Sequence, residues 1–123
     1  GPGVRPGRAR GLVEFVDLFP TIAEACGLQA PAGLAGRTLW PLLRNPAAPG
    51  REAVFTMVSR GPARRGVSVR TDRWRYTEWS DGERELYDHE VNPEETRNLA
   101  AAREDIVAEL SARLEAHRTA VTK

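Results

Sequence analysis

Apolar and polar residues alternate through the middle of the chain, a pattern typical of half-buried β-strands. Four segments show this alternation or are rich in β-branched and aromatic residues: Ala53–Val58, Val67–Thr71, Trp74–Trp79 and Glu85–Asp88. Asp72-Arg73 and Ser80-Asp81-Gly82 separate consecutive segments and favour tight turns. The pattern predicts a four-stranded antiparallel meander, with Trp74 and Tyr76 on one face of the sheet and Trp79 on the other.

An apolar stripe with helical spacing follows the predicted sheet. Its members recur in steps of three and four residues, and they are Ile106, Leu110, Leu114 and His117. The stripe predicts an amphipathic helix over about residues 101–117, which needs an apolar surface to cover. Because one face of the sheet is the nearest such surface, we expect an α+β fold. In this fold a four-stranded antiparallel sheet packs against a C-terminal helix, with Trp74 and Tyr76 in the core.

The N-terminal third of the chain has a different pattern. Residues 1–11 are rich in Gly, Pro and Arg and predict a loop or linker. Leu12–Val16 is a short apolar run that favours a strand, and Asp17 is then placed to cap a helix that Gly27 ends. Arg37–Leu43 predicts one or two helical turns. The predicted strand has no evident partner within the chain, which suggests that this region belongs to a larger body.

A length of 123 residues, with 41% apolar and 28% charged residues, is typical of a single globular domain. No run of about 18 apolar residues occurs, so we expect no membrane span. Cys26 is the only cysteine, which excludes an internal disulfide and a cysteine-based metal site. It ends an apolar helical pattern, and we expect it to be a small buried hydrophobic residue.

The formal net charge is only +1, but the charges are unevenly distributed. Residues 60–75 hold six arginines and one aspartate, whereas residues 76–96 hold eight acidic residues and one arginine. The basic segment either binds an anionic ligand or pairs with the acidic segment that follows it. Arginines beside Trp and Tyr also occur in proteins that bind single-stranded nucleic acid. The near-neutral net charge and the adjacent acidic segment argue against that partner.

Four segments match known motifs in order and spacing. Val13–Thr21 resembles v-x-l-v-D-l-x-P-T, and Gly36–Leu43 resembles G-x-S-L-l-P-L-L. Val69–Tyr76 resembles the hairpin v-R-t-d-x-y-K-Y, and Glu85–Ala100 resembles a longer motif that runs from E-L-Y-D to N-L-a. These are motifs of the sulfatases, and together they cover most of the chain. The hairpin is most similar to that of the iduronate-2-sulfatase-like branch.

The resemblance implies a large α/β domain of the alkaline-phosphatase type, followed by a smaller C-terminal subdomain. Residues 1–45 would be the tail of the large domain, with its last strand and helix, and residues 46–123 would form the subdomain. The resemblance also implies that the parent protein hydrolyses sulfate esters, including those of sulfated sugars, with a formylglycine nucleophile and Ca²⁺. Its partners would be the remainder of the sulfatase chain and the sulfate-ester substrate.

The catalytic groups that the resemblance implies are not found in this segment. Formylglycine forms in a Cys/Ser-x-Pro-x-Arg motif, whereas Cys26 is followed by Gly27-Leu28-Gln29-Ala30. No cluster of Asp and Asn residues has the spacing of a calcium site. His89, His117 and Lys123, the only lysine, are expected to be structural or exposed. We therefore predict no catalytic residue, no metal ligand and no bound cofactor here, and a segment that is inactive alone.

Four residues are candidates for the rim of the substrate cleft: Arg60, Arg64, Arg65 and Trp79. The three arginines fall in a predicted loop, Ser59–Gly66, which contributes to the cleft in some sulfatases. A guanidinium group suits a sulfated or carboxylated sugar because it binds an oxyanion at two points. The alternative is a solvated loop, or ion pairs with the acidic segment. Trp79 lies on the outer face of the predicted sheet, where it could stack on a sugar ring.

Two other hypotheses stay open. The chain could be a free-standing binding or interaction module whose arginine-rich loop engages an anionic ligand or nucleic acid. It could also be a structural domain of a related phosphodiesterase or phosphoglycerate mutase, although the Glu85–Ala100 motif favours sulfatases. If residues 12–27 dock on a larger sheet, the isolated chain exposes apolar side chains and should self-associate. Those side chains are Val13, Phe15, Phe19 and Ile22.

Overall fold

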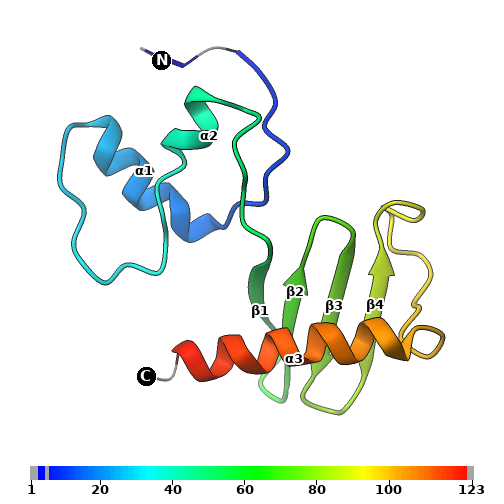
Figure 1. Ribbon diagram of the computed structural model, residues 1–123. Helices are drawn as coiled ribbons and strands as arrows, with labels where there is room; N and C mark the ends of the chain where they lie inside the picture. The colour runs from blue at the N-terminus through cyan, green and yellow to red at the C-terminus, as the bar shows by residue number, and fades with distance from the viewer. Residues whose placement is uncertain (1–2, 5, 122–123) are drawn as a thin grey trace. The chain divides into compact units, whose positions relative to one another are not determined.

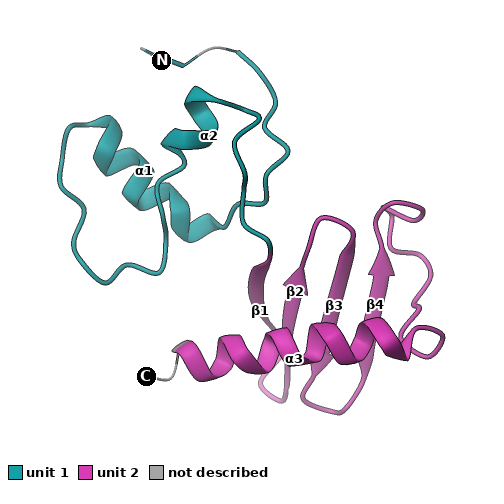
Figure 2. Ribbon diagram, viewed as in Figure 1, with its two compact units in different colours: residues 1–52 teal, residues 53–123 magenta. Residues whose placement is uncertain are grey.

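The computed structural model describes residues 3–4 and 6–121. Parts of the predicted linker (residues 1, 2 and 5) and Lys123 lie outside the described residues. The chain divides into two compact units, Gly1–Glu52 (unit 1) and Ala53–Lys123 (unit 2), which Figure 2 shows in different colours. The assignment of residues 1–45 to a larger domain stays a prediction.

Unit 2 contains the predicted meander. Its strands are β1 (Val54–Arg60), β2 (Arg64–Arg70), β3 (Trp74–Trp79) and β4 (Arg84–Asp88), all antiparallel and in the spatial order β1-β2-β3-β4 (Figure 1). Tyr76 pairs with Val69 of β2 and with Leu86 of β4, which places these three side chains on one face. The Asp72-Arg73 turn is confirmed by the bond from the Thr71 amide to the Trp74 carbonyl, at 2.8 Å.

Helix α3 (Glu104–Val121) lies across one face of the sheet in Figure 1 and completes the core. Tyr76, Leu86 and Val69 are 1%, 0% and 0% exposed, and on the helix Leu110 and Leu114 are 1% and 0% exposed. Fully burying a side chain of this size contributes about 1.5–3 kcal/mol, so this cluster holds the helix on the sheet. The predicted α+β arrangement of sheet and helix is confirmed, as are the core positions of Trp74 and Tyr76.

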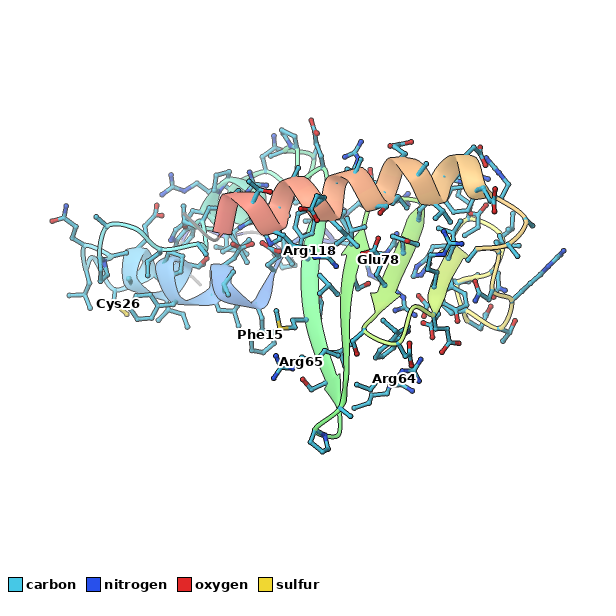
Figure 3. The ribbon with its side chains drawn as sticks, turned by 90° about the horizontal axis from the view of Figure 1, so that it is seen from below. Phe15, Cys26, Arg64, Arg65, Glu78 and Arg118 are labelled. Carbon is cyan, nitrogen blue, oxygen red and sulfur yellow. The ribbon has the colours of Figure 1, made fainter. Side chains whose placement is uncertain are left out.

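Polar and aromatic contacts fix the register of α3 on the sheet. Glu78 of β3 accepts hydrogen bonds from the hydroxyls of Ser111 (2.6 Å) and Tyr76 (3.1 Å), and it pairs with Arg118 at 2.9 Å. Figure 3 shows Glu78 and Arg118 beside each other under the helix. His117 stacks on Phe55 with ring centroids 3.8 Å apart, so the expected packing role of this histidine is confirmed.

The structure of unit 1 contradicts the prediction of an N-terminal strand. Residues 12–16 form no strand: Leu12 makes an isolated bridge with Arg51, and Phe15–Asp17 is a 3-10 helix (η1) that leads into helix α1 (Leu18–Ala25). A strand needs a neighbour along its length to satisfy its backbone groups, and unit 1 supplies one residue only. The predicted turns near residue 40 are confirmed as helix α2 (Trp40–Arg44).

Asp17 takes the N-cap position of α1, but its carboxylate does not cap that helix. It accepts hydrogen bonds from the backbone amides of Glu14 and Arg37, each at 2.9 Å, and from the guanidinium of Arg51. Asp17 therefore ties three separate segments of unit 1 together. At the other end of α1 the prediction is confirmed, because Gly27 has φ +69° and its amide bonds to the Glu24 carbonyl.

The outer side of α1 is apolar and exposed. Phe15 is 90% exposed, Phe19 57% and Ile22 61%. Cys26 is also exposed, so the expectation that it is buried is wrong. Ile22 and Cys26 lie four residues apart and share a helix face that no described part of the chain covers.

Candidate functional site

The side of the sheet opposite α3, here named the open face, carries most of the candidate residues. Because side chains alternate along a strand, Arg64, Gly66, Ser68 and Arg70 of β2 lie on this face while Val67 and Val69 face the helix. A pocket of about 460 Å³ lies on it. Residues of all four strands line it, among them Arg60, Ser68, Arg70, Arg75, Thr77 and Trp79.

Two arginines lie over the indole of Trp79 at one end of the open face. The guanidinium carbons of Arg60 and Arg64 are 5.1 Å and 4.2 Å from the ring centroid, within the range of cation–π contacts. Trp79 itself is 6% exposed. Gly66 makes room for the ring, since a Cβ there would lie 2.9 Å from Trp79 Cε3 and Cζ3. The arginines, rather than the indole, therefore present this end of the face to solvent.

The prediction that residues 59–66 form a loop is wrong. Strand β1 continues to Arg60 and β2 begins at Arg64, so only residues 61–63 form the turn. Gly61 takes φ +73° there, a conformation that glycine adopts without strain. Arg60 and Arg64 are consequently cross-strand partners, and both project to the open face.

Arg64 and Arg65 lie on different faces of the sheet although they are neighbours in sequence. Arg64 pairs with Asp81 at 2.9 Å and with Glu83, which balances its charge. Arg65 is exposed and belongs to the face that carries α3; Figure 3 shows the two arginines on either side of the hairpin. The structure thus brings Arg60, Arg64 and Trp79 together and leaves Arg65 apart.

A second polar group on the open face was not among the sequence candidates. Arg75 of β3 makes a bidentate ion pair with Glu95, and His89 Nε2 lies 2.6 Å from Glu95 Oε1. The hydrogen bond from Arg75 holds the pKa of Glu95 below its usual value. Beside them the Thr77 hydroxyl donates to Ser68 Oγ at 3.1 Å. Strand alternation could have placed these side chains on one face, but not the contribution of Glu95 from a distant loop.

Arg70 is a half-buried arginine of the open face that has no carboxylate partner within salt-bridge distance among the described residues. Its Nη1 donates to the carbonyls of Thr71 and of Asp72, the latter at 3.0 Å, in the adjacent turn. No ion pair joins it to a carboxylate of the described residues. Burial lowers the pKa of Arg70, with Asp72 and Glu95 acting on it at longer range. A half-buried guanidinium in this state favours a bound anion.

The described residues show no metal site. Among residues 3–4 and 6–121, no group of three or more His, Cys, Asp or Glu side chains is placed to hold a metal ion. In the same part of the chain, no helix has the length and apolarity needed to cross a membrane. The chemistry that the open face offers is the binding of oxyanions by guanidinium groups and hydroxyls.

A protein-family model and several arylsulfatases are similar to this chain. A family model described as "N-sulphoglucosamine sulphohydrolase, C-terminal" matches residues 3–120. Arylsulfatase K of Rattus norvegicus is 28% identical over 93% of this chain and 22% of its own length. Arylsulfatase K of Homo sapiens is 27% identical over 93% of this chain and 24% of its own length. The chain therefore spans about a quarter of the length of these relatives.

Solved structures agree with this description. A 2-O GAG sulfatase matches with a TM-score of 0.82 and 30% identity, over 97% of this chain and 28% of its own. A second structure, of a Bacteroides thetaiotaomicron protein, matches with a TM-score of 0.85 and 30% identity over the same shares. A third structure, in complex with its substrate D-glucosamine-2-N,6-O-disulfate, has a TM-score of 0.73 and 26% identity over 84% of this chain and 23% of its own.

Proposed function

The chain belongs to the family of N-sulphoglucosamine sulphohydrolase C-terminal regions, and from this premise we propose that it completes a sulfatase that hydrolyses sulfate esters of sulfated sugars. The family match over residues 3–120, almost the whole chain, is the observation that carries this proposal. The substrate class rests on the sulfated sugars named for two of the solved relatives. The assignment to the iduronate-2-sulfatase-like branch stays a prediction.

The chemistry of the reaction would come from the remainder of the parent protein. A sulfatase uses formylglycine as nucleophile and Ca²⁺ to neutralise the sulfate oxygens. The residues of this chain fit neither group, because Cys26 lacks the proline and arginine of the formylglycine motif. The described residues also offer no cluster of oxygen ligands for Ca²⁺. The part that we assign to this chain is therefore structural support and substrate contact.

Unit 1 supports docking onto the body of that protein. Val13, Phe15, Phe19 and Ile22 are 47–90% exposed, although side chains of this kind are normally buried. Phe15 lies in η1, Phe19 and Ile22 lie in α1, and Val13 lies just before η1, so the four exposed side chains come from one short segment. We assign these side chains to contact with the large domain of the same protein.

The basic end of the open face is the proposed rim of the substrate cleft. Arg60 has no ion-pair partner among the described residues, while Arg64 is neutralised by Asp81 and Glu83. Arg60 is therefore the candidate best placed to contact a sulfate or carboxylate, with Trp79 serving as its platform. Arg65 lies on the other face of the sheet and makes a matched control for this proposal.

The alternative of a nucleic-acid-binding module is not favoured. The acidic segment neutralises much of the basic one through Arg64 with Asp81, Arg73 with Asp88, and Arg75 with Glu95. Arginines engaged in this way cannot also neutralise phosphates, which supply most of the affinity for nucleic acid. The basic and acidic segments are thus largely paired with each other within the fold.

The proposal is tested by reading the coding sequence in frame upstream of Gly1 and expressing the whole reading frame together with a formylglycine-generating enzyme. A Cys/Ser-x-Pro-x-Arg motif and release of inorganic sulfate from sulfated disaccharides are the expected results. This chain alone should release none. A complete protein without that motif, or one that cleaves phosphate esters in place of sulfate esters, would refute the proposal.

The rim is tested in the same assay by exchanging single arginines. Arg60→Gln should raise KM for a sulfated disaccharide at least about 10-fold with kcat little changed, because one charged hydrogen bond contributes about 1.5–3 kcal/mol. Arg65→Gln removes the same charge from the opposite face and should leave both constants unchanged. Equal effects of the two variants would show that only net charge matters and would remove Arg60 from the rim.

A further inference from the structure

We propose that the open face carries an oxyanion-binding site anchored by Arg70, which holds a sulfate or carboxylate group of a saccharide. The ligand class rests on the proposed function, whereas the site itself rests on contacts within unit 2. Arg70 lies at the end of β2 opposite to Arg64, about 20 Å away at about 3.3 Å per residue. Arg70 therefore anchors the end of the pocket that is far from Arg64, while the rim candidate Arg60 lines the other end of the same pocket.

The half-buried arginines of unit 2 differ in charge balance. Each of the others has a carboxylate partner: Arg64 with Asp81 and Glu83, Arg75 with Glu95, Arg103 with Asp105, and Arg113 with Glu109. Arg70 alone among these described side chains donates only to neutral carbonyls of its own turn. A charge that is partly removed from water without a counter-ion costs free energy, and a bound anion recovers it.

Arg70 lines a concave part of the open face. The pocket that it lines has a volume of about 460 Å³, within the 300–1,000 Å³ typical of small-molecule sites. Thr56, an exposed residue of β1 that lines the same pocket, adds a hydroxyl donor. Val54 and Val58 add apolar surface on the side of β1. A concave surface with donors and an apolar side suits a sugar that bears an anionic group.

The charged side chains that line the pocket are mainly arginines. Arg60, Arg70 and Arg75 line it together with His89, and Glu85 is the carboxylate among the lining side chains. Glu95 is bonded to Arg75 and lies within hydrogen-bond distance of His89. With Arg75 and Glu95 counted as a neutral pair, Arg60 and Arg70 still outnumber Glu85, which favours an anionic ligand over a cationic or neutral one.

The experiment titrates the isotopically labelled chain with glucose 6-sulfate, with glucuronate and with neutral glucose, and follows amide and indole resonances by NMR. We expect saturable shifts of the Trp79 indole and of the Thr71 and Asp72 amides with both anionic sugars, and none with glucose. Arg70→Gln should weaken binding at least 10-fold. Arg70→Lys keeps the charge but loses the planar fork, so it should have an intermediate affinity.

Arg65→Gln is the matched control, since it removes a charge of the same kind from the opposite face and should leave binding unchanged. Unchanged core resonances of Tyr76 in each variant show that the fold is retained. No saturable shift with either anionic sugar, or equal loss in the two glutamine variants, would overturn the site. Acetate binding as tightly as the sugars would overturn the saccharide assignment and indicate a docking site for a carboxylate side chain. Binding needs no turnover, so sulfate release tests the proposed function separately.

Discussion

Replacing Asp17 by asparagine removes one negative charge from the hydrogen-bonded centre of unit 1 and changes the side-chain volume little. Asp17 is 1% exposed, and Arg51, which donates to both of its oxygens, is 18% exposed. The asparagine amide would place a second donor against the guanidinium. Arg51 would keep Glu14, 3.2 Å away, as its remaining carboxylate partner. We expect this single change to loosen the segments that meet at Asp17.

The magnitude follows from the acidity of Asp17. Burial by itself raises the pKa of this carboxyl, but hydrogen bonds from Arg51 and from the Glu14 and Arg37 amides lower it from 3.8 to about 2. A shift of this size corresponds to at most about 2.4 kcal/mol in favour of the ionised folded state, because solvent screening weakens a pair whose arginine is partly exposed. Because the folded pKa is depressed, this stability is fully present above about pH 4 and is lost as pH falls towards about 2.

Hydrogen exchange followed by mass spectrometry measures the effect, with rates corrected for intrinsic exchange. At pH 7, peptides from residues 12–52 of Asp17→Asn should exchange up to about 60-fold faster than in the parent chain, while peptides from unit 2 serve as the internal control. Between pH 4 and pH 2 the parent chain should lose protection in unit 1 and the variant should show little further change. Wild-type protection in the variant, or the same pH dependence in both proteins, would refute the reasoning.

Three further changes test the core, the open face and the exposed surface. Leu110→Ala removes a side chain that is 1% exposed and should lower the free energy of unfolding of unit 2 by about 2–5 kcal/mol, measured by urea denaturation; a loss below about 1 kcal/mol would contradict the described packing. Gly66→Ala should displace the Trp79 ring, cost about 1–3 kcal/mol and shift tryptophan emission to longer wavelength, whereas unchanged emission would mean that the ring is not held there. Phe15→Lys should reduce self-association of the chain in sedimentation velocity, because Phe15 is 90% exposed; an equal reduction by Val91→Lys, at a 75% exposed site in unit 2, would contradict a specific apolar surface.

The sheet and its helix were predictable because their information is local. Alternation in residues 67–71 and 74–79 sets which side chains face the core, and the turn at Ser80-Asp81-Gly82 sets the order of the strands. The stripe of Leu110 and Leu114 then has one suitable surface to cover. Each of these signals lies within a few residues of the element that it specifies.

The N-terminal segment was not predictable, because its structure depends on contacts between residues that are far apart in the sequence. Residues 12–16 have the apolar character of a strand, but strand formation depends on a partner that the described chain does not supply beyond Arg51. The segment folds instead around Asp17, whose partners Arg37 and Arg51 are 20 and 34 residues away. Cys26 is exposed for a related reason, because burial depends on what covers a helix face and not on the helix alone.

The sequence by itself determined the sulfatase resemblance, the four-stranded meander and the C-terminal helix, because motif order and hydrophobic period are properties of the chain. Only the tertiary structure decided which arginines are available to a ligand. Neighbours in sequence such as Arg64 and Arg65 point to opposite faces of the sheet, and Arg75 is neutralised by Glu95, 20 residues further along the chain. The charge that a site presents depends on which counter-ions the fold brings within reach, and pairing of that kind is set by long-range packing.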